Sequence, residues 1–557
     1  LESPRRDDKP MWWAMFERAA MTVEERYDDI SCLAGLTLEG VPIPEKRSKI
    51  ASYTFDPSQE TKIHGNSKVL VAQSTAAKPS IVSFDPEGSI ELKMSTKALD
   101  EKLGGRFPTR LCLIPSEYVS SQVITQALLE IVSRWADGRG LPGCLRRLIL
   151  RQRPQLVGLS DGTPLKDLAV VLPAMRGSTL AIQGPPGTGK TFTASRLIKA
   201  LIESGKRVGI TSNSHKAILN LLSGVHKAGA DLSGSVYAPS QDDETPDVPP
   251  GVSTSPSKDA FALYRKGVIA GTAWLFSREE AADSLDYLFV DEAGQVSLAN
   301  VAAMSRATDN LVLLGDQNQL PMPTQGTHPG ESGCSSLVYL LKGHAVVPPE
   351  LGVFLESTYR MHPEVCGFVS ESFYEGKLHW APGTANQRVS SLAATGPVPL
   401  EAGIHFHAVP HIGNTQASDE EVAAIVEILD SLLGREFTDR NGVTRPLELS
   451  DVLFVAPYNM QVRHLERALP VGAKVGSVDR FQGQEAPVVI VSLCSSAGEY
   501  GSRGLSFILD RNRLNVALSR AQALAIVVAD PAIACTPANS IKELQLLNTF
   551  CRLVQSH

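Results

Sequence analysis

The pattern of apolar and polar positions changes character several times along the 557-residue chain. Residues 12–29 carry apolar side chains at helical spacing, which predicts a helix. From about residue 33 to 116, short β-rich runs alternate with turn sequences such as DPSQ, HGNS and DPEGS, which predicts a small antiparallel barrel or sheet. Residues 117–153 return to helical spacing. We therefore expect residues 1–155 to form an accessory domain with a helical stalk and a small β-barrel.

From about residue 165 the pattern becomes strand, loop and helix in alternation, which predicts a parallel α/β sheet. The expected strands lie in STLAIQ, RVGITS, GVIAGT, YLFVDEA and LVLLGD, and each ends in a polar or Gly-rich loop. Ligands of such sheets bind at the carboxyl ends of the strands. The polar, Pro- and Ser-rich stretch at about 231–258 predicts a mobile surface insertion. These features predict a first α/β domain over residues 156–344.

A second α/β domain is expected over residues 345–557. Its predicted strands lie in IHFHAV, DVLFVAPY, AKVGSV, PVVIVSL and ALAIVVAD. A helix between them begins with Ser418 as N-cap and Glu421 three residues on, the pattern of a capping box. The fold class is thus α/β, with two parallel units in tandem behind the accessory domain.

Composition limits the class of protein. Hydrophobic residues make up 43% and charged residues 20%, typical of a soluble globular protein, and no apolar run approaches the ~20 residues that span a bilayer. The eight cysteines are scattered without a CxxC pair, which argues against a zinc ribbon or iron–sulfur cluster and favours a reducing, cytoplasmic location. The net charge of −7 does not exclude nucleic acid, because binding depends on local basic grooves. The chain starts with Leu rather than Met, which leaves open that it is a segment of a longer protein.

The sequence GPPGTGKT at residues 184–191 follows the strand LAIQ and precedes a helix. Glycines let backbone N–H groups face phosphate oxygens, and the helix N-terminus adds a favourable dipole. Lys190 can reach the β- and γ-phosphates, and the Thr191 hydroxyl can ligate Mg²⁺. Alone, the loop indicates only nucleoside triphosphate (NTP) binding, since kinases, GTPases and transporters also use it. The candidate phosphate-binding residues are Gly184, Pro185, Gly187, Thr188, Gly189, Lys190 and Thr191.

Two further strand ends carry candidate chemistry. Asp291 and Glu292 end the strand YLFV, where a P-loop enzyme places a second Mg²⁺ contact and a carboxylate that polarises the attacking water. The strand in LVLLGDQNQLP ends in Gly315 and Asp316, and Gln319 beyond it carries an amide that can sense the γ-phosphate.

GPPGTGKT, DEAGQ and GDQNQLP occur here in the order of motifs I, II and III of superfamily 1 helicases, and the chain resembles that family. TYRMHPEV at 358–365, VDRFQGQE at 478–485 and NRLNVALSRA at 512–521 resemble the up-frameshift-like branch. That branch includes RNA-surveillance helicases and the nuclease-fused helicase of Okazaki-fragment processing. The resemblance covers roughly residues 165–530 and implies two RecA-like domains with the ATP site between them. An N-terminal barrel on a helical stalk is also the arrangement known in the family.

The resemblance implies further roles at matching positions. Arg360 and Arg520 correspond to arginine fingers that stabilise transition-state charge when the cleft closes. Glu485 corresponds to a ribose-binding residue, and Gln482 and Gly483 to residues lining the cleft between the domains. Contacts to nucleic acid are implied for Ser212, Asn213, His215, Thr272, Tyr458 and Gln461.

The chain departs from the family upstream of the phosphate loop. Lys166 stands where a glutamine that reads adenine is expected, which leaves the choice of ATP over other NTPs open. Gln152 and Gln155 are candidates to replace it from a different geometry.

We therefore expect an ATP- and Mg²⁺-dependent helicase that moves 5′→3′ on single strands as a monomer, without contact to a membrane. DNA is favoured over RNA, because no zinc-rich domain typical of RNA-surveillance relatives is present and the barrel is compact. Alternatives stay open: an RNA helicase, a translocase that displaces proteins without separating strands, the motor of a larger nuclease whose cleavage domain or partner lies outside this chain, and an NTP-binding module without turnover. Strand displacement and strand-stimulated hydrolysis distinguish them.

Overall fold

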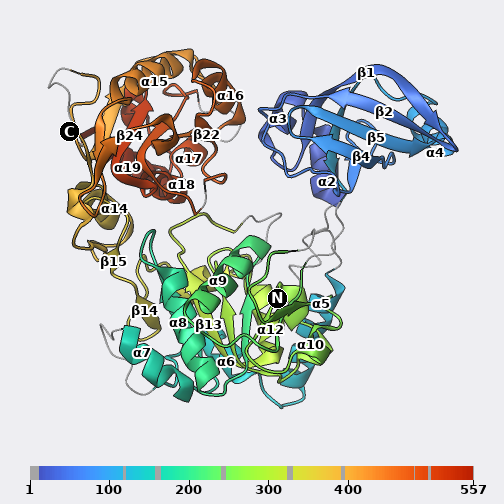
Figure 1. The fold of residues 1–557 in the computed structure, drawn as a ribbon, viewed down its shortest axis with the longest axis vertical. Coiled ribbons are helices and arrows are strands. Elements are labelled where there is room, and N and C mark those ends of the chain that lie inside the picture. Colours follow the sequence, from blue (N-terminus) through green and yellow to red (C-terminus); the bar gives the residue numbers. More distant parts are fainter. Residues whose placement is uncertain are drawn as a thin grey trace.

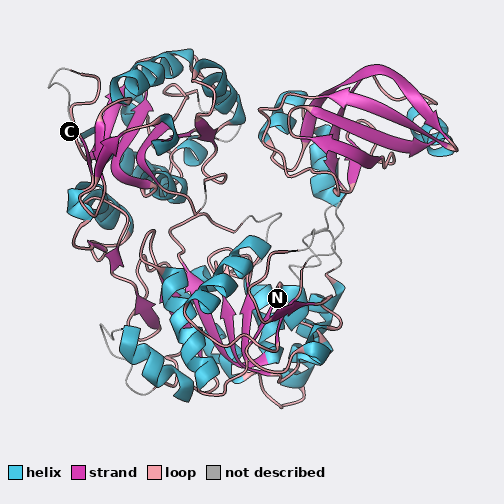
Figure 2. Cartoon of the chain, in the orientation of Figure 1, coloured by secondary structure: helices cyan, strands magenta, loops and turns pink. Residues whose placement is uncertain are grey.

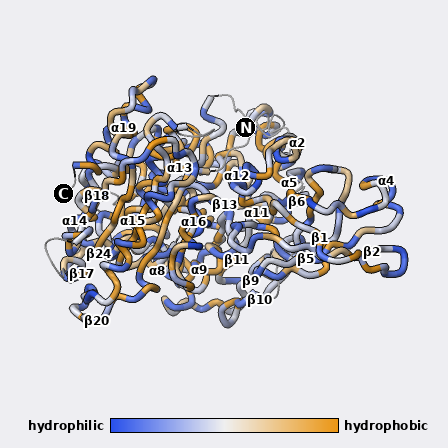
Figure 3. Tube along the Cα trace, turned by 90° about the horizontal axis from the view of Figure 1, so that it is seen from above, coloured by the Kyte–Doolittle hydropathy of each residue, from blue (hydrophilic) through white to orange (hydrophobic). Residues whose placement is uncertain are grey.

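The computed structural model describes residues 12–116, 121–156, 165–239, 246–322, 330–390, 396–481, 483–499 and 504–555. It contains an antiparallel sheet formed by the N-terminal part of the chain and two parallel sheets formed by the rest (Figure 1). Helices flank both parallel sheets (Figure 2). Hydrophilic stretches lie at the outer ends of the molecule, near α4 and β20 (Figure 3). In the described part of the chain, no helix is both long and apolar enough to cross a membrane.

The N-terminal unit is a six-stranded antiparallel sheet in the order β3-β6-β1-β2-β5-β4. Its described pairings leave β3 and β4 as edge strands, and a cavity of about 520 Å³ lies between residues of these two strands. The expected barrel is therefore not closed by a β3–β4 strand pair. The elements are α2 (Trp12–Ala20), α3 (Val23–Asp28), β1 (Leu33–Glu45), β2 (Ser48–Thr54), β3 (Val69–Val71), β4 (Ser80–Asp85), β5 (Ser89–Ser95), α4 (Thr96–Leu103) and β6 (Arg110–Pro115).

Two details of this unit differ from the pattern-based prediction. The single helix expected over 12–29 is two helices, because the Thr22 side chain caps the N-terminus of α3 and forms a capping box with Glu25. The long strand β1 was not predicted, because glycines and prolines at positions 35, 40, 42 and 44 interrupt its apolar alternation.

The first parallel sheet has eight strands in the order β10-β9-β11-β8-β12-β13-β7-β14. Its inner strands are buried on both faces, which explains why they appear in the sequence as continuous apolar runs. The strands are β7 (Thr179–Gln183), β8 (Val208–Thr211), β9 (Ser235–Tyr237), β10 (Val252–Thr254), β11 (Val268–Ala270), β12 (Leu285–Val290), β13 (Thr308–Gly315) and β14 (Gly352–Phe354). The helices are α5 (Gln122–Ala136), α6 (Gly143–Ile149), α7 (Leu165–Val171), α8 (Lys190–Glu203), α9 (His215–Lys227), α10 (Ala260–Leu263), α11 (Ala273–Phe276), α12 (Leu298–Met304) and α13 (Ser336–Leu341).

This sheet and its flanking helices include segments that were predicted to lie outside the first parallel sheet or its domain. Strands β9 and β10 lie within the stretch expected at 231–258 as a surface insertion, yet they pair in parallel and extend the sheet. Their residues, SVY and VST, do not form a continuous apolar run. Strand β14 pairs with β7, so the sheet continues past residue 345. Helices α5 and α6 pack into the core of the same unit, although they precede residue 156.

The second parallel sheet has five strands in the order β18-β24-β23-β21-β22, and all five match expected strands. They are β18 (Gly403–Ala408), β21 (Val452–Val455), β22 (Lys474–Gly476), β23 (Ala486–Ser492) and β24 (Ala521–Ala529). The helices are α14 (Pro363–Phe373), α15 (Asp419–Leu432), α16 (Asn459–Ala468), α17 (Leu505–Ile508), α18 (Arg511–Leu518) and α19 (Ile541–Gln555). Small strand pairs flank it: β15 (Ser357–Thr358) with β16 (His379–Trp380), and β17 (Arg388–Val389) with β19 (Glu436–Thr438), which also pairs β20 (Thr444–Pro446). Each of the two parallel α/β units thus matches the predicted fold class.

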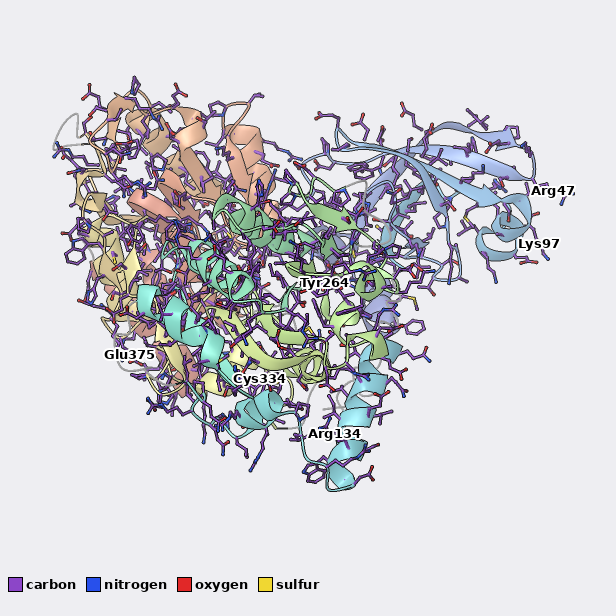
Figure 4. All side chains as sticks on the ribbon, turned by 60° about the horizontal axis from the view of Figure 1, so that its bottom comes forward. Arg47, Lys97, Arg134, Tyr264, Cys334 and Glu375 are labelled. Atoms are coloured by element: carbon purple, nitrogen blue, oxygen red, sulfur yellow. The ribbon has the colours of Figure 1, made fainter. Side chains whose placement is uncertain are left out.

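The antiparallel unit contacts the second parallel unit through polar groups. The Asn459 side chain donates to the main-chain carbonyl of Tyr27 at 2.8 Å, and the Arg463 guanidinium lies 3.9 Å from the centre of the Tyr27 ring. Glu60 accepts from the Ser477 hydroxyl at 2.9 Å. These contacts join α3 and the loop at Glu60 to α16 and the end of β22 (Figure 1). At the opposite tip of the antiparallel sheet, the basic side chains Arg47 and Lys97 project outward (Figure 4).

Candidate nucleotide site and strand-binding edge

The loop at 184–191 leaves the carboxyl end of β7 and runs into α8. Gly187 and Gly189 both have φ of 76°, a left-handed conformation that glycine adopts without strain, and Gly189 forms the N-cap of α8. The Lys190 ammonium donates to the main-chain carbonyl of Gly184 at 2.6 Å, so it lies inside the curve of the loop. A Cβ at Gly184 would lie 2.2 Å from Lys190 Cγ. The loop is therefore shaped around the ammonium, as a phosphate cradle requires.

Asp291 and Glu292 follow β12, two strands from the loop in the same sheet. Burial raises the pKa of Asp291, the charge of Glu292 raises it further, and the nearby ammonium of Lys190 lowers it. Glu292 has φ of 51°, which is uncommon for a residue with a side chain. This backbone strain at the second of two adjacent carboxylates is typical of a functional site.

The GDQNQ loop (residues 315–319) follows β13, which lies between β12 and β7. The Gln319 amide, almost fully buried, donates to the Asp316 carboxylate at 3.0 Å. The three strand ends predicted to carry the nucleotide chemistry thus belong to adjacent strands of one sheet.

A second wall of the site comes from the segment around β15. The Thr358 hydroxyl donates to the Pro186 carbonyl, and the Tyr359 N–H donates to the Gly187 carbonyl, both at 2.9 Å. A Cβ at Gly187 would lie 2.5 Å from Arg360 Cβ, so glycine permits this close approach. The expected finger Arg360 therefore lies directly against the phosphate loop.

The Arg360 guanidinium is bound within its own unit. Its Nε donates to Glu485 at 2.6 Å, and its Nη1 donates to the Ser519 carbonyl at 3.1 Å. Gln522 donates to the other oxygen of Glu485 at 3.0 Å. Burial raises the pKa of Glu485, but the charge and hydrogen bond of Arg360 outweigh it, and the pKa is lowered overall.

Arg520 is a buried cation with unsatisfied donors. Its side chain is 3% exposed, and its Nε and Nη2 atoms have no hydrogen-bond partner among the described residues. Burial and the charge of Arg360 lower the pKa of Arg520, Glu292 and Glu485 raise it, and the net pKa is about 9. Since a buried donor without a partner is costly, this guanidinium fits a bound anion.

Two positions predicted for the nucleotide site are not described. Gln482 lies outside the described residues, as does the side chain of Lys166, whereas Gly483 is placed with φ of 83°. The main-chain N–H of Gln155 donates to the Ser178 hydroxyl.

The residues predicted to contact nucleic acid fall into two groups by exposure. The first group, with exposed or half-buried side chains, is Asn213, His215 and Thr272, and the second, with buried side chains, is Ser212, Tyr458 and Gln461. Asn213 is exposed and donates to the Gln295 carbonyl at 2.6 Å, and His215 and Thr272 are half-buried at neighbouring strand ends. Ser212 is only 2% exposed. The first group therefore marks an accessible edge of the first parallel sheet.

The structure contradicts surface roles for Tyr458 and Gln461, and it buries Ser212. The Tyr458 ring lies 5.2 Å from the ring of Phe507 in the core of the second unit. The Gln461 amide accepts from the Ser418 N–H and donates to the Ser492 hydroxyl. Both side chains are buried inside the second unit, 1% and 0% exposed, so they have no surface from which to reach a nucleic-acid strand.

Two family models match the chain, each described as an AAA domain, over residues 169–329 and 335–532. The DNA polymerase alpha-associated DNA helicase A of Schizosaccharomyces pombe is 25% identical over 409 residues, 63% of this chain and 60% of that protein. The putative helicase mov-10-B.1 of Danio rerio is 27% identical, over 63% of this chain and 39% of that protein. The DNA replication ATP-dependent helicase/nuclease dna2 of S. pombe is 26% identical, over 62% of this chain and 26% of that protein.

The chain belongs to the superfamily 1 helicases, and within them to the up-frameshift-like type. The chain spans less than two thirds of the length of each of these relatives. The solved complex of arterivirus nonstructural protein 10 (helicase) with DNA is 14% identical with a TM-score of 0.41, over 91% of this chain and 80% of that one.

Several residues of the helicase site were not predicted. Thr358, Tyr374, Asn512 and Asn515 contact the phosphate loop or the GDQNQ loop. Thr358 and the two asparagines lie in the quoted strings TYRMHPEV and NRLNVALSRA, in which a role was predicted only for the arginines Arg360 and Arg520. Their side chains bind main-chain carbonyls, and sequence patterns give no signal for such partners.

Proposed function

We propose that this helicase hydrolyses ATP in the cleft between its two parallel units and uses the cycle to move 5′→3′ along a single strand, with DNA preferred over RNA. The observation that carries the proposal is the buried, partly unsatisfied guanidinium of Arg520, close to the charges of Arg360 and Glu292. Such a cation fits an anion that both units bind at once.

The residues of the first unit fit a nucleoside triphosphate with Mg²⁺. In the proposed site, Gly184, Pro185, Gly187, Thr188 and Gly189 hold phosphate oxygens, and Lys190 neutralises their charge. Thr191 and Asp291 would hold Mg²⁺, which would neutralise charge between the phosphates. The described residues contain no group of three or more His, Cys, Asp and Glu suited to a metal. The pair of Thr191 and Asp291 suits Mg²⁺, because that ion commonly takes one or two carboxylates beside substrate oxygens and water.

Glu292 would accept a proton from the attacking water, and Gln319 would sense the γ-phosphate. Arg360 and Arg520 would neutralise the charge that develops there. Glu485, Gln482 and Gly483 would line the same cleft. Because Arg360 is paired with Glu485, its finger role requires that the guanidinium shares or leaves this partner when nucleotide binds.

The proposed strand path runs along the edge marked by Asn213, His215 and Thr272. The arrangement we propose has an accessory unit through residue 116, a first motor domain that includes α5 through β14, and a second motor domain that begins near β15. A nuclease, in the same protein or as a partner, is a further proposal, since relatives include helicase/nucleases of which this chain covers only 26%. We propose a monomeric motor.

Hydrolysis stimulated by single strands tests the proposal. Matched single-stranded DNA and RNA are titrated against NTP turnover at several salt concentrations, because phosphate contacts are strongly salt-dependent. We expect stimulation by both strands, larger for DNA, that falls as salt rises. Turnover unaffected by either strand would contradict the motor, and larger stimulation by RNA would reverse the choice of strand.

A further inference from the structure

The GDQNQ loop belongs to the first parallel sheet but is bound by a helix of the second unit. Asn512 of α18 donates from Nδ2 to the carbonyl of Gln317 at 3.0 Å and to that of Gln319. One turn later, Asn515 donates from Nδ2 to the carbonyl of Asn318 at 2.7 Å. The main chain of the loop is therefore fixed by two amide groups from α18.

Tyr374, directly after α14, completes this attachment. Its hydroxyl donates to Asp316 at 2.6 Å and accepts from Asn515 Nδ2 at 2.8 Å. The Tyr374 and Asn515 side chains are fully buried, and Asp316 is 3% exposed. Burial and the charge of Asp316 raise the pKa of Tyr374 well above its ordinary value, so the hydroxyl remains a donor. Glu375, the next residue, lies at the far side of the molecule from the antiparallel sheet (Figure 4).

The Asp316 carboxylate is held by neutral donors. Besides Tyr374, it accepts from the Gln319 side chain at 3.0 Å, from the Gln183 side chain at 3.3 Å and from the Asn318 N–H at 3.1 Å. Hydrogen bonds to a buried charge are among the stronger ones, and losing one leaves part of the charge unsatisfied. The Tyr374 hydroxyl, with the shortest of these distances, is therefore expected to fix the carboxylate and, through it, the Gln319 amide.

The network connects the parts of the site that must meet during hydrolysis. Gln183 directly precedes the phosphate loop, and Gln319 is the proposed γ-phosphate sensor. Helix α18 ends at Leu518, two residues before Arg520. We infer that Tyr374 and Asn515 are positioning residues that set Gln319 and Arg520 relative to each other, so that turnover, rather than nucleotide binding, depends on their hydrogen bonds. This inference rests on the proposed function.

Tyr374→Phe tests it, because the change keeps the ring and removes only the hydroxyl. We expect kcat for strand-stimulated hydrolysis to fall about tenfold, with KM and the Kd of a fluorescent ADP analogue within about twofold of wild type. The matched control is Tyr287→Phe on β12 of the first sheet, which removes a buried hydroxyl that donates to the Leu172 carbonyl. The control should lose comparable stability and keep its kcat.

A double-mutant cycle separates positioning from general weakening. If Tyr374 acts through Gln319, Tyr374→Phe should lower kcat little further in a Gln319→Ala background. A Tyr374→Phe enzyme with wild-type kcat, or losses that multiply in the double variant, would overturn the inference while leaving the proposed function intact. A wild type without hydrolysis would overturn both.

Discussion

Glu292 shows how the chemistry of the site is set at the scale of single residues. It follows the half-buried Asp291, adopts a left-handed backbone, and contributes a charge that raises the pKa of its neighbour. Two adjacent carboxylates can serve different roles, one as a metal ligand and one as a base.

Glu292→Gln should separate nucleotide binding from hydrolysis. Because the amide keeps the shape and the backbone conformation but cannot accept a proton, we expect kcat to fall by about 10²- to 10⁴-fold. Binding of nucleotide and of single strands should stay within about twofold. Turnover kinetics and fluorescence titration measure the two effects. Glu279→Gln, at an exposed glutamate of the same unit, is the control, and an equal loss of binding and turnover would argue against a base.

Residues also mark the limit of what the sequence could predict. Lys190, Asp291 and Arg520 were expected in the site, and the structure brings the segments that carry them together, because each stands at the end of a strand or helix with a recognisable string. Tyr458 lies in the predicted strand segment DVLFVAPY and Gln461 three residues beyond it, and both were expected to contact nucleic acid, yet they are buried. A string specifies which residue occupies a position, and packing decides whether its side chain faces solvent.

At the scale of elements, the phosphate loop and β15 contact each other at Gly187, where there is no room for a side chain.

Strong apolar runs predicted the inner strands of both parallel sheets. They did not predict β9, β10 or β14, because these three-residue strands gain their pairing from the neighbouring strands rather than from their own pattern.

Gly187→Ala should disrupt this contact. A Cβ there would meet Arg360 Cβ and the Thr358 hydroxyl, each at 2.5 Å, so we expect at least a tenfold loss of kcat as the segment moves away from the loop. Gly205→Ala is matched, because Gly205 has φ of 72° and open space around its Cβ position. It should show the same backbone strain, about 1 kcal/mol in chemical denaturation, with unchanged kcat. Equal kcat losses in both variants would contradict the contact.

At the scale of the whole molecule, the antiparallel unit is attached to the second parallel unit through a cluster of charges. Glu466 of α16 lies 3.8 Å from Arg480, and Asp56 and Glu60 of the antiparallel unit face the same cluster with Arg463. Burial raises the pKa of Glu466, Arg480 lowers it, Glu60 and Asp56 raise it, and the net pKa is about 7. No sequence pattern indicated this contact, because its partners lie more than 400 positions apart.

Docking of the two units should depend on pH. Because the pKa of Glu466 is higher in the docked state, docking is favoured below its ordinary value and weakens as pH rises through about 7. Fluorescence energy transfer between the units should thus fall from pH 6 to pH 8. Glu466→Gln should keep the docked signal at pH 8, while Glu427→Gln, at an exposed glutamate of α15, should behave as wild type. A pH response that survives in Glu466→Gln would assign it to another group.

We propose that both parallel units complete one hydrolytic site, and the Arg520→Ala variant tests this. Its NTP turnover is measured with and without single-stranded DNA, and its nucleotide affinity is measured beside it. Since the guanidinium stabilises transition-state charge from outside the phosphate loop, we expect a loss of kcat of about 10³-fold or more and a change in nucleotide Kd within a few-fold. Equal losses in kcat and affinity, or unchanged turnover, would contradict it.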